Sequence, residues 1–209
     1  MVAKPQNSMP GQVRADRLAA RLSALYQVLQ AIAASLDVNQ SLQLIVDKAC
    51  ALLAVDRCGL FLVEQRTADG LVLRCHYLRG LPREDFQRIR LGPDEGITAH
   101  VMAEEKALWT DDILADARFP LSQDLRALLA AHDIRGILCA PVVVRRQVLG
   151  LLYVYPEADV GFSQDDADFL AALAVQAGIA LENARLLAME GLEEPRDAAP
   201  RLEPTYPAD

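Results

Sequence analysis

The chain has 209 residues and a formal net charge of −8, from 21 lysines and arginines against 29 aspartates and glutamates. This length predicts one domain with appendages, and the hydrophobic content of 52% is enough for a core that folds without disulfides or a metal. The acidic balance argues against nonspecific nucleic-acid binding, which needs a basic surface. Residues 1–13 lack the apolar core of a signal peptide, and the uncharged run 169–181 is shorter than the roughly 20 residues that cross a bilayer. We expect a cytoplasmic protein that binds neither membranes nor nucleic acid.

Two helices are predicted near the N-terminus. Residues 1–13, which include Pro5, Pro10 and Gly11, are expected to form a disordered lead-in. Residues 14–36 then place apolar side chains at alternating spacings of four and three, the a/d pattern of a helix that packs against another helix. A second amphipathic helix follows, with Asn39 or Ser41 as its expected N-cap. The members of the a/d seam are Leu18, Leu22, Leu25, Leu29, Ile32 and Leu36.

Four strands in two hairpins are predicted further along the chain. Residues 58–63 and 71–78 are apolar runs separated by the turn dipeptide Asp69-Gly70. Residues 136–144 and 148–155 predict a tight hairpin in which Pro141 marks a bulge or an edge position. Between the hairpins, residues 79–135 are expected to be irregular, with a short helix at 96–103, a strand at 107–111 and a helix at 122–132.

A long helix is expected from Ser163 to about Met189, with Asp166 three residues after Ser163 in a capping-box arrangement. Residues 190–209 are acidic and contain several prolines, so they are expected to form a disordered tail. Together the elements predict an α+β sandwich with a central antiparallel sheet of five or six strands. The first two helices and the C-terminal helix would cover one face, and the irregular segment would cover the other and form a small-molecule pocket.

Several short strings occur in an order that resembles the GAF domain family. They are GPDEGI at 92–97, WTDDI at 109–113, DARF at 116–119, ILCAPV at 137–142, VLGLLY at 148–153 and FSQDD at 162–166. The resemblance spans about residues 22–187 and implies a single GAF domain over residues 14–189, with its core at about 37–187 and an N-terminal helix at 14–36. It also implies a regulatory, ligand-sensing module of bacterial signalling proteins, often dimeric, without fixing the ligand.

The residues present can be compared with the needs of GAF relatives that bind cyclic nucleotides. Those relatives carry an Asn-Lys pair after the last strand, followed by a phenylalanine and an Asp-Glu pair. This chain keeps Phe162 and Asp166 but has Pro156-Glu157 and Ala167 at the other positions. This mode of cyclic-nucleotide binding is therefore not expected.

The cysteines and histidines favour neither catalysis nor metal binding. Bilin-binding relatives need a pocket cysteine and methionine sulfoxide reductase relatives need reactive thiols, yet no cysteine lies between Cys75 and Cys139. Cys75 and His76 are adjacent in a strand, so they should point to opposite faces and not pair. His100 and His132 are candidate haem ligands, with polar caps as the alternative. We expect no enzyme activity and no metal site, and the cofactor stays open.

The expected pocket lies between the irregular segment and the last strand. Tyr153 and Tyr155 share one face of that strand, whereas Leu152 and Val154 share the other. In the alternative, the large aromatic side chains of the segment fill the space and no ligand binds. Residues 74–90 carry five arginines against two acids, which fits an anionic ligand, an acidic partner or a solvated loop. The candidate ligand-binding residues are Ile97, Trp109, Asp111, Phe119, Leu125, Leu128, His132, Tyr153 and Tyr155.

We expect a signal-transduction module that binds an unidentified small molecule and acts through a homodimer on a downstream signalling protein. The last helix is apolar on more sides than one sheet can cover. Pairing the first and last helices across a two-fold axis would form a four-helix bundle, with the a/d seam, Ala177 and Ala184 at the interface and Ala19, Tyr26 and Ala33 facing the body. Two alternatives stay open: the helices cover each other within one chain, or the domain is a dimerisation scaffold without a ligand.

Overall fold

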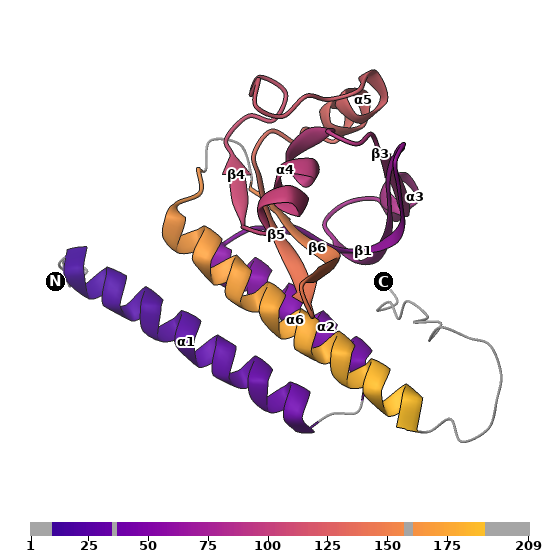
Figure 1. Ribbon diagram of the computed structural model, residues 1–209. Coiled ribbons are helices and arrows are strands. Elements are labelled where there is room, and N and C mark those ends of the chain that lie inside the picture. Colours follow the sequence, from indigo (N-terminus) through magenta and orange to yellow (C-terminus); the bar gives the residue numbers. More distant parts are fainter. Residues whose placement is uncertain (1–9, 35–36, 157–160, 191–209) are drawn as a thin grey trace, which may run out of the picture.

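The computed structural model describes residues 10–34, 37–156 and 161–190 (Figure 1). The first helix begins at Pro10, inside the predicted lead-in, and the last ends at Glu190. The remainder of the predicted tail, and Leu36 of the predicted seam, lie outside the described residues. In chain order the elements are α1 Pro10–Ala34, α2 Val38–Leu53, β1 Arg57–Thr67, β2 Gly70–Arg79, α3 Arg83–Phe86, β3 Arg88–Leu91, α4 Gly96–Glu104, β4 Leu108–Thr110, α5 Gln123–Ala131, β5 Ile137–Val144, β6 Gln147–Tyr155 and α6 Gln164–Glu190.

A six-stranded antiparallel sheet forms the centre of the fold and confirms the predicted α+β sandwich. Its strand order is β3-β2-β1-β6-β5-β4, so the two predicted hairpins join through the pairing of β1 with β6. The short β4 pairs with β5 only as far as Cys139. Pro141 therefore lies on a part of β5 that has no second strand beside it, and its missing N–H leaves no ladder bond unmade.

Helices α2 and α6 pack directly on one face of the sheet and bury a first core, here called the helix-side core. Leu42, Ile45 and Val46 of α2 and Leu170 and Leu173 of α6 are almost completely buried there. The N-cap of α2 is Asp37, whose carboxylate accepts hydrogen bonds from the backbone N–H groups of Asn39 at 2.9 Å and Gln40 at 3.4 Å. The predicted caps, Asn39 and Ser41, are wrong because both residues already lie inside the helix.

The capping box predicted at the start of α6 is present. Ser163 donates to the Asp166 carboxylate through its backbone N–H at 2.9 Å and its hydroxyl at 2.6 Å, and the backbone N–H of Asp166 donates back to the Ser163 hydroxyl at 3.3 Å. Within the described chain, α6 is the one helix long and apolar enough to cross a membrane by length and composition. In this fold, however, Leu170, Leu173 and Ala177 of α6 pack into the helix-side core.

Helix α1 lies on the outer side of α2 and α6 and runs in the same direction as α6 (Figure 1). Ala24, Val28 and Ile32 form its buried stripe. Arg21 is also buried: its guanidinium donates to the backbone carbonyl of Asp165 at 2.8 Å and forms an ion pair with the Asp166 carboxylate. α1 therefore covers part of α6 within one chain, as one of the two alternatives expected.

The predicted orientation of α1 is wrong in one respect. Ala19 and Tyr26, both expected to face the body, are exposed, and the exposed fraction of Tyr26 is 62%. The buried stripe follows Arg21 and Val28 instead, so the helix is rotated and most of the a/d seam faces outward. Ala33, the third residue expected to face the body, has no described side chain.

The segment that covers the other sheet face contains more regular structure than expected. The short helix α3 and strand β3 were not predicted, because each has only four residues. β3 pairs with β2 at the edge of the sheet and places Ile89 and Leu91 over the second core, with arginines between them facing outward. α4 and α5 complete the cover, close to their predicted positions.

A bulge interrupts β2 at His76. Leu60 pairs with Tyr77 and Phe61 pairs with Cys75, so His76 is the extra residue between them. Cys75 therefore packs into the core under the cover and Tyr77 into the helix-side core, although the two residues are two apart. Burial, with a smaller contribution from the nearby Arg83 charge, lowers the pKa of His76 to about 4.

Candidate functional site

A narrow cavity of about 40 Å³, here called the inner cavity, lies between the sheet and the covering segment. Its walls are apolar apart from a few hydroxyl groups, which is typical of a site for a small molecule. The sheet contributes Phe61, Leu73, Ile137, Tyr153 and Tyr155, and the cover contributes Phe86, Ile89, Leu91, Gly96, Ile97, Thr98, Ile113, Leu121, Leu125, Leu128 and Leu129.

The polar groups of the inner cavity gather around two tyrosines. The hydroxyls of Thr98 and Tyr153 form a 2.6 Å hydrogen bond, and the Tyr153 ring stacks on Tyr155 with centroids 6.1 Å apart and an interplanar angle of 2°. Phe61 meets Tyr153 edge-on at 5.4 Å. Burial raises the pKa of both tyrosines well above the usual value, so both hydroxyls stay protonated.

Among the three hydroxyl groups that line the inner cavity, only that of Tyr155 makes no hydrogen bond with a described residue. Its side chain is 4% exposed and lines the inner cavity. Its hydroxyl makes no hydrogen bond with any residue that the structure describes. An unmade hydrogen bond in a buried site costs about 1–3 kcal/mol, so this group is poised to pair with a ligand or water.

The predicted ligand-binding residues are only partly brought together. Ile97, Leu125, Leu128, Tyr153 and Tyr155 line the inner cavity, and the predicted separation of the two tyrosines from Leu152 and Val154 is present. Four other predicted residues do not line it.

Trp109 and Asp111 are misplaced by the phase of β4. Leu108 packs toward the inner cavity side, so the next residue, Trp109, points to the opposite face and packs against the helix-side core. Asp111 follows the end of β4 and is exposed. Neither residue can contact a ligand in the inner cavity.

Phe119 and His132 lie near the inner cavity but outside its lining. Phe119 is buried beneath the loop, with its ring edge-on to His100 at 5.0 Å. His132 sits behind Phe86, and its Nε2 is 2.9 Å from the Asp85 carboxylate. Both histidines that were candidate haem ligands therefore have local partners.

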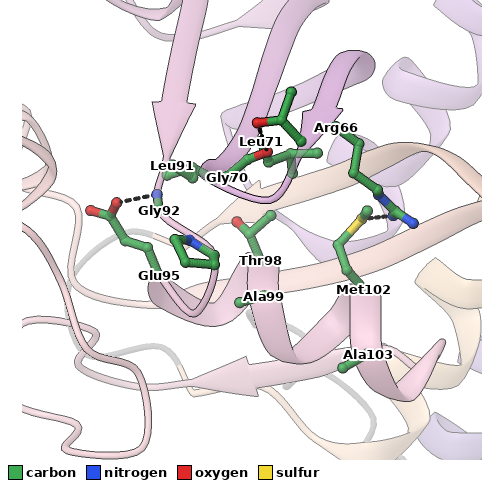
Figure 2. A pocket seen from close by; sticks show the side chains of 12 residues that line it. Arg66, Gly70, Leu71, Leu91, Gly92, Glu95, Thr98, Ala99, Met102 and Ala103 are labelled. Carbon is green, nitrogen blue, oxygen red and sulfur yellow. Dashed lines mark hydrogen bonds between the residues drawn. The ribbon is translucent and has the colours of Figure 1, made fainter.

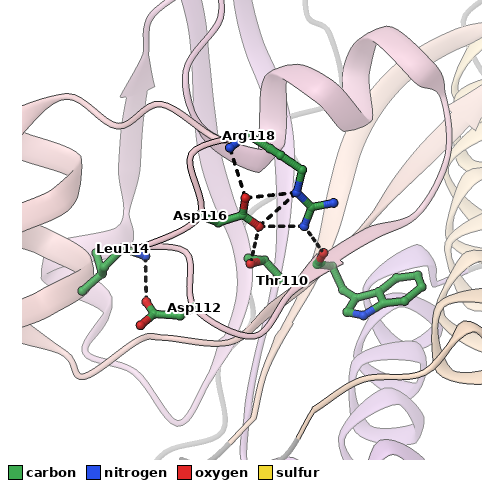
Figure 3. Close-up of polar contacts among 6 residues, drawn as sticks. Thr110, Asp112, Leu114, Asp116 and Arg118 are labelled. Carbon is green, nitrogen blue, oxygen red and sulfur yellow. Dashed lines mark hydrogen bonds and ion pairs between the residues drawn. The ribbon is translucent and has the colours of Figure 1, made fainter.

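The polar residues of the WTDDI and DARF strings hold the loop that covers the sheet (Figure 3). The Asp116 carboxylate accepts a hydrogen bond from Thr110 Oγ1 at 2.7 Å and from the Arg118 guanidinium at 2.6–3.1 Å. Hydrogen bonding from Arg118 holds the pKa of Asp116 far below its usual range. Asp112 accepts from the backbone N–H of Leu114 at 3.0 Å and pairs with Arg135 at 3.1 Å. These groups shape the loop rather than face the cavity.

The start of α4 is fixed against α5 by Glu95 and Gly96. The Glu95 carboxylate accepts hydrogen bonds from the backbone N–H groups of Gly92 at 2.7 Å and Ser122 at 2.9 Å. Gly96 has a φ of +66°, which favours glycine, and its N–H donates to the Pro120 carbonyl at 2.7 Å. This arrangement turns Ile97 and Thr98 toward the cavity.

A larger and more open hollow of about 290 Å³, here called the outer groove, lies beside the inner cavity (Figure 2). Leu91 and Thr98 line both spaces. The charged groups of the groove have partners within it, because Arg66 donates to Met102 Sδ at 3.5 Å and Glu95 holds Gly92. The outer groove therefore differs from the inner cavity in that charged side chains line it.

Sequence reasoning missed eleven lining residues, four of which come from β1, β2 and β3. Phe61 and Leu73 belong to strands that were predicted, and their alternation could have placed them on this face. Ile89 and Leu91 could not be found in this way because β3 was not recognised as a strand. Within the described ranges, no group of three histidine, cysteine or acidic side chains could hold a metal ion.

Two curated relatives match most of this chain but are much longer proteins. A probable 3′,5′-cyclic phosphodiesterase from Caenorhabditis elegans is 26% identical over 148 residues, which are 68% of this chain and 20% of the relative. The phosphoenolpyruvate-dependent phosphotransferase system protein of Escherichia coli K12 is 27% identical over 173 residues, 81% of this chain and 22% of the relative. The chain thus spans about a fifth of these relatives.

Solved structures share the fold at low identity. The GAF domain of a phosphoenolpyruvate-protein phosphotransferase from Coxiella burnetii has a TM-score of 0.66 and 22% identity, covering 82% of this chain and 98% of that one. Free methionine-R-sulfoxide reductase from Neisseria meningitidis, with its substrate, has a TM-score of 0.63 and 20% identity, covering 90% and 99%. A far-red absorbing protein with bound biliverdin IXα has a TM-score of 0.63 and 14% identity, covering 78% and 99%.

The family model for the GAF domain matches residues 37–181, from the N-cap of α2 to the middle of α6. This match includes the whole sheet, every residue that lines the inner cavity and both cores apart from the α1 residues. The chain therefore belongs to the GAF domain family.

Proposed function

We propose that this chain is a cytoplasmic signal-transduction module that binds an unidentified small molecule in the inner cavity and reports its presence to a downstream signalling protein. GAF domains are generally regulatory modules of signalling proteins that bind small molecules. Because the chain spans only about a fifth of its curated relatives, their enzymatic activities are not carried over to it.

The observation that carries this proposal is the Tyr155 hydroxyl in the inner cavity. The tyrosine is 4% exposed and lines the inner cavity, and its hydroxyl makes no hydrogen bond with a described residue, whereas the hydroxyls of Thr98 and Tyr153 pair with each other. A cavity shaped only for packing would be lined by apolar side chains, since a buried hydroxyl without a partner is unfavourable.

A thermal-shift screen of small molecules tests the proposal. A ligand at one hundred times its Kd adds about 2.7 kcal/mol of stability. Leu128→Trp fills the inner cavity and is expected to abolish the shift, whereas the matched control Ala127→Trp, at an exposed position of the same helix, keeps it. A hit whose shift survives Leu128→Trp binds elsewhere and contradicts the proposal.

The proposed output is a homodimer formed by the exposed faces of α1 and α6. Leu22 is 59% exposed and Leu29 45% exposed, and α6 offers a second apolar stripe. Burial of one such side chain against a partner contributes about 1.5–3 kcal/mol. Two copies joined through these stripes would form the four-helix bundle expected from the sequence. The exposed members are Leu18, Leu22, Tyr26, Leu29, Val175, Ile179, Leu186 and Leu187.

Four predicted interface residues are wholly or partly buried within one chain. Ala177 is completely buried against the sheet within one chain, so it cannot touch a partner. Ile32 and Ala184 line a small hollow between α1, α2 and α6 of the same chain. Leu25 is half-buried against the helix-side core. The proposed interface therefore keeps only the outward members of the seam.

A ligand-free dimerisation scaffold is the second candidate function. The small volume of the inner cavity, about 40 Å³, favours it, because this space holds only a few water molecules. A broad screen without a single cavity-dependent shift, together with a stable dimer, would support the scaffold.

We propose no catalytic role for the chain. All four cysteines are buried and unbridged. Burial raises the pKa of Cys75 to about 11 and also raises those of Cys58 and Cys139, which disfavours the thiolate form of these three. A hydrogen bond with Cys58 lowers the pKa of Cys50, but Cys50 is buried in the helix-side core, away from the inner cavity.

A further inference from the structure

Resting on the proposed ligand site, we infer that the inner cavity binds a small uncharged molecule with one planar ring and a hydrogen-bonding group. The charged substrates and ligands associated with its relatives, a cyclic nucleotide, free methionine sulfoxide and biliverdin, are then the wrong chemical class for this chain.

The absence of charge on the described cavity lining favours an uncharged ligand. Every described side chain that lines the inner cavity is uncharged. Moving an ionised phosphate or carboxylate out of water without a counter-charge is strongly unfavourable. Two carboxylates around the cover have partners of their own: Asp85 lies 2.9 Å from His132 Nε2, and Asp116 pairs with Arg118 at 2.6 Å.

The hydroxyl groups of the inner cavity favour a ligand with a hydrogen-bonding group. Tyr155 presents a protonated hydroxyl that can donate or accept, and Thr98 and Tyr153 present a bonded pair with an acceptor lone pair to spare. A neutral carbonyl, amide or hydroxyl satisfies these groups without bringing a charge into the cavity. The complementary ligand therefore has one such group at its edge.

The shape of the inner cavity favours a ligand with one planar ring. The parallel rings of Tyr153 and Tyr155 and the edge-on ring of Phe61 form a flat aromatic wall, which favours stacking with a planar ligand. The volume of about 40 Å³ is smaller than the roughly 150 Å³ cavity that accepts benzene, so even one ring needs the cover to yield. Leu125 and Leu128 of α5 are half-buried parts of that cover, and so are Ile89 and Leu121. A tetrapyrrole is far too large.

The test uses benzamide and benzoate, which have nearly the same shape and differ in charge, on the full chain. Calorimetric titration and thermal shift are recorded for both, and for phenol, a 3′,5′-cyclic nucleotide, methionine-R-sulfoxide and biliverdin. We expect benzamide or phenol to raise Tm by roughly 5–10 °C at one hundred times Kd, and benzoate to bind at least about 100-fold more weakly than benzamide.

Two variants locate the binding. Tyr155→Phe, which removes the hydroxyl and keeps the ring, should weaken benzamide binding about tenfold, whereas the matched control Tyr77→Phe, in the core on the other face of the sheet, should not change it. Leu128→Trp should abolish binding, and Leu121→Trp serves the same purpose if the first variant has a lowered Tm without ligand.

The outcomes separate the two proposals. Tight, cavity-dependent binding of benzoate or of one of the charged molecules would overturn the inference on ligand class and leave the proposed ligand site intact. Absence of cavity-dependent binding by every probe, charged and neutral, would overturn both. Binding of benzamide that Tyr155→Phe does not weaken would refute the role of this hydroxyl.

Discussion

Replacement of Arg21 by methionine removes the charged group that ties α1 to α6 while keeping most of the length of the side chain. Arg21 is 6% exposed, donates to the Asp165 carbonyl at 2.8 Å, pairs with Asp166, and lies with its guanidinium carbon 5.0 Å above the centre of the Phe169 ring. All of these contacts end at the first turns of α6, so the variant tests how firmly the two helices are joined.

The magnitude follows from what each group loses. Removing one partner of a buried ion pair costs about 3–5 kcal/mol. The Asp166 carboxylate is 15% exposed and keeps two hydrogen bonds from Ser163, so we expect a smaller loss of about 2–3 kcal/mol for Arg21→Met. Asp166→Asn keeps the cap but loses the charge and should cost about 1–2 kcal/mol. The double variant should lose about 1.5 kcal/mol less than the sum.

Urea unfolding at pH 7 followed by the fluorescence of Trp109 measures these values, because the single tryptophan packs against the helix-side core. Arg17→Met, at an exposed position on the same helix, is the control and should stay within about 0.5 kcal/mol of the unmodified protein. Additive losses for Arg21→Met and Asp166→Asn would refute the reasoning, because two groups that bond directly cannot act independently.

Three further outcomes are expected. The double variant Leu22→Glu with Leu29→Glu places like charges on the exposed face of α1 and should convert a dimer to monomers, as measured by light scattering at about 50 µM. The stability of the monomer should fall by no more than about 0.5 kcal/mol. An unmodified protein that is monomeric at that concentration contradicts the four-helix bundle. Arg146 has a φ of +64° in the β5–β6 turn, a backbone conformation that glycine adopts more easily. Arg146→Gly should therefore stabilise the protein by roughly 0.5–1 kcal/mol and raise its Tm by about 2 °C. Burial lowers the pKa of His76 to about 4 in the folded state, whereas the unfolded chain binds this proton near pH 6.5. The free energy of unfolding should therefore fall by roughly 2–3 kcal/mol as the pH is lowered from above 6.5 toward 4. In urea titrations, His76→Phe should reduce this pH dependence.

The fold could be predicted because its main elements are long and regular. The alternation of Tyr153 and Tyr155 with Leu152 and Val154 assigns β6 to two different cores, and the Asp69-Gly70 turn marks the first hairpin. These local patterns are strong in a strand or helix that is buried on defined faces.

The candidate site could be predicted only in part, because its walls depend on short elements and on strand phase. Trp109 was expected in the cavity, but a three-residue strand leaves the phase open by one residue, and that residue decides the face. The bulge at His76 reverses the alternation of β2, and β3 is too short to show a pattern. Spatial neighbours such as the Arg21 and Asp166 pair leave no trace in a single sequence.

Gly178 allows α6 to approach β5 unusually closely. A Cβ at this position would lie 2.8 Å from the Val143 carbonyl oxygen. If α6 slid along its axis by one turn, Ala174 or Glu182 would bring such an atom to this point, so the backbone of β5 blocks the slide. The contact at Gly178 therefore fixes the position of α6 along β5. Ile137 of the same strand lines the inner cavity, so we expect a displacement of that wall to reach α6 through this contact.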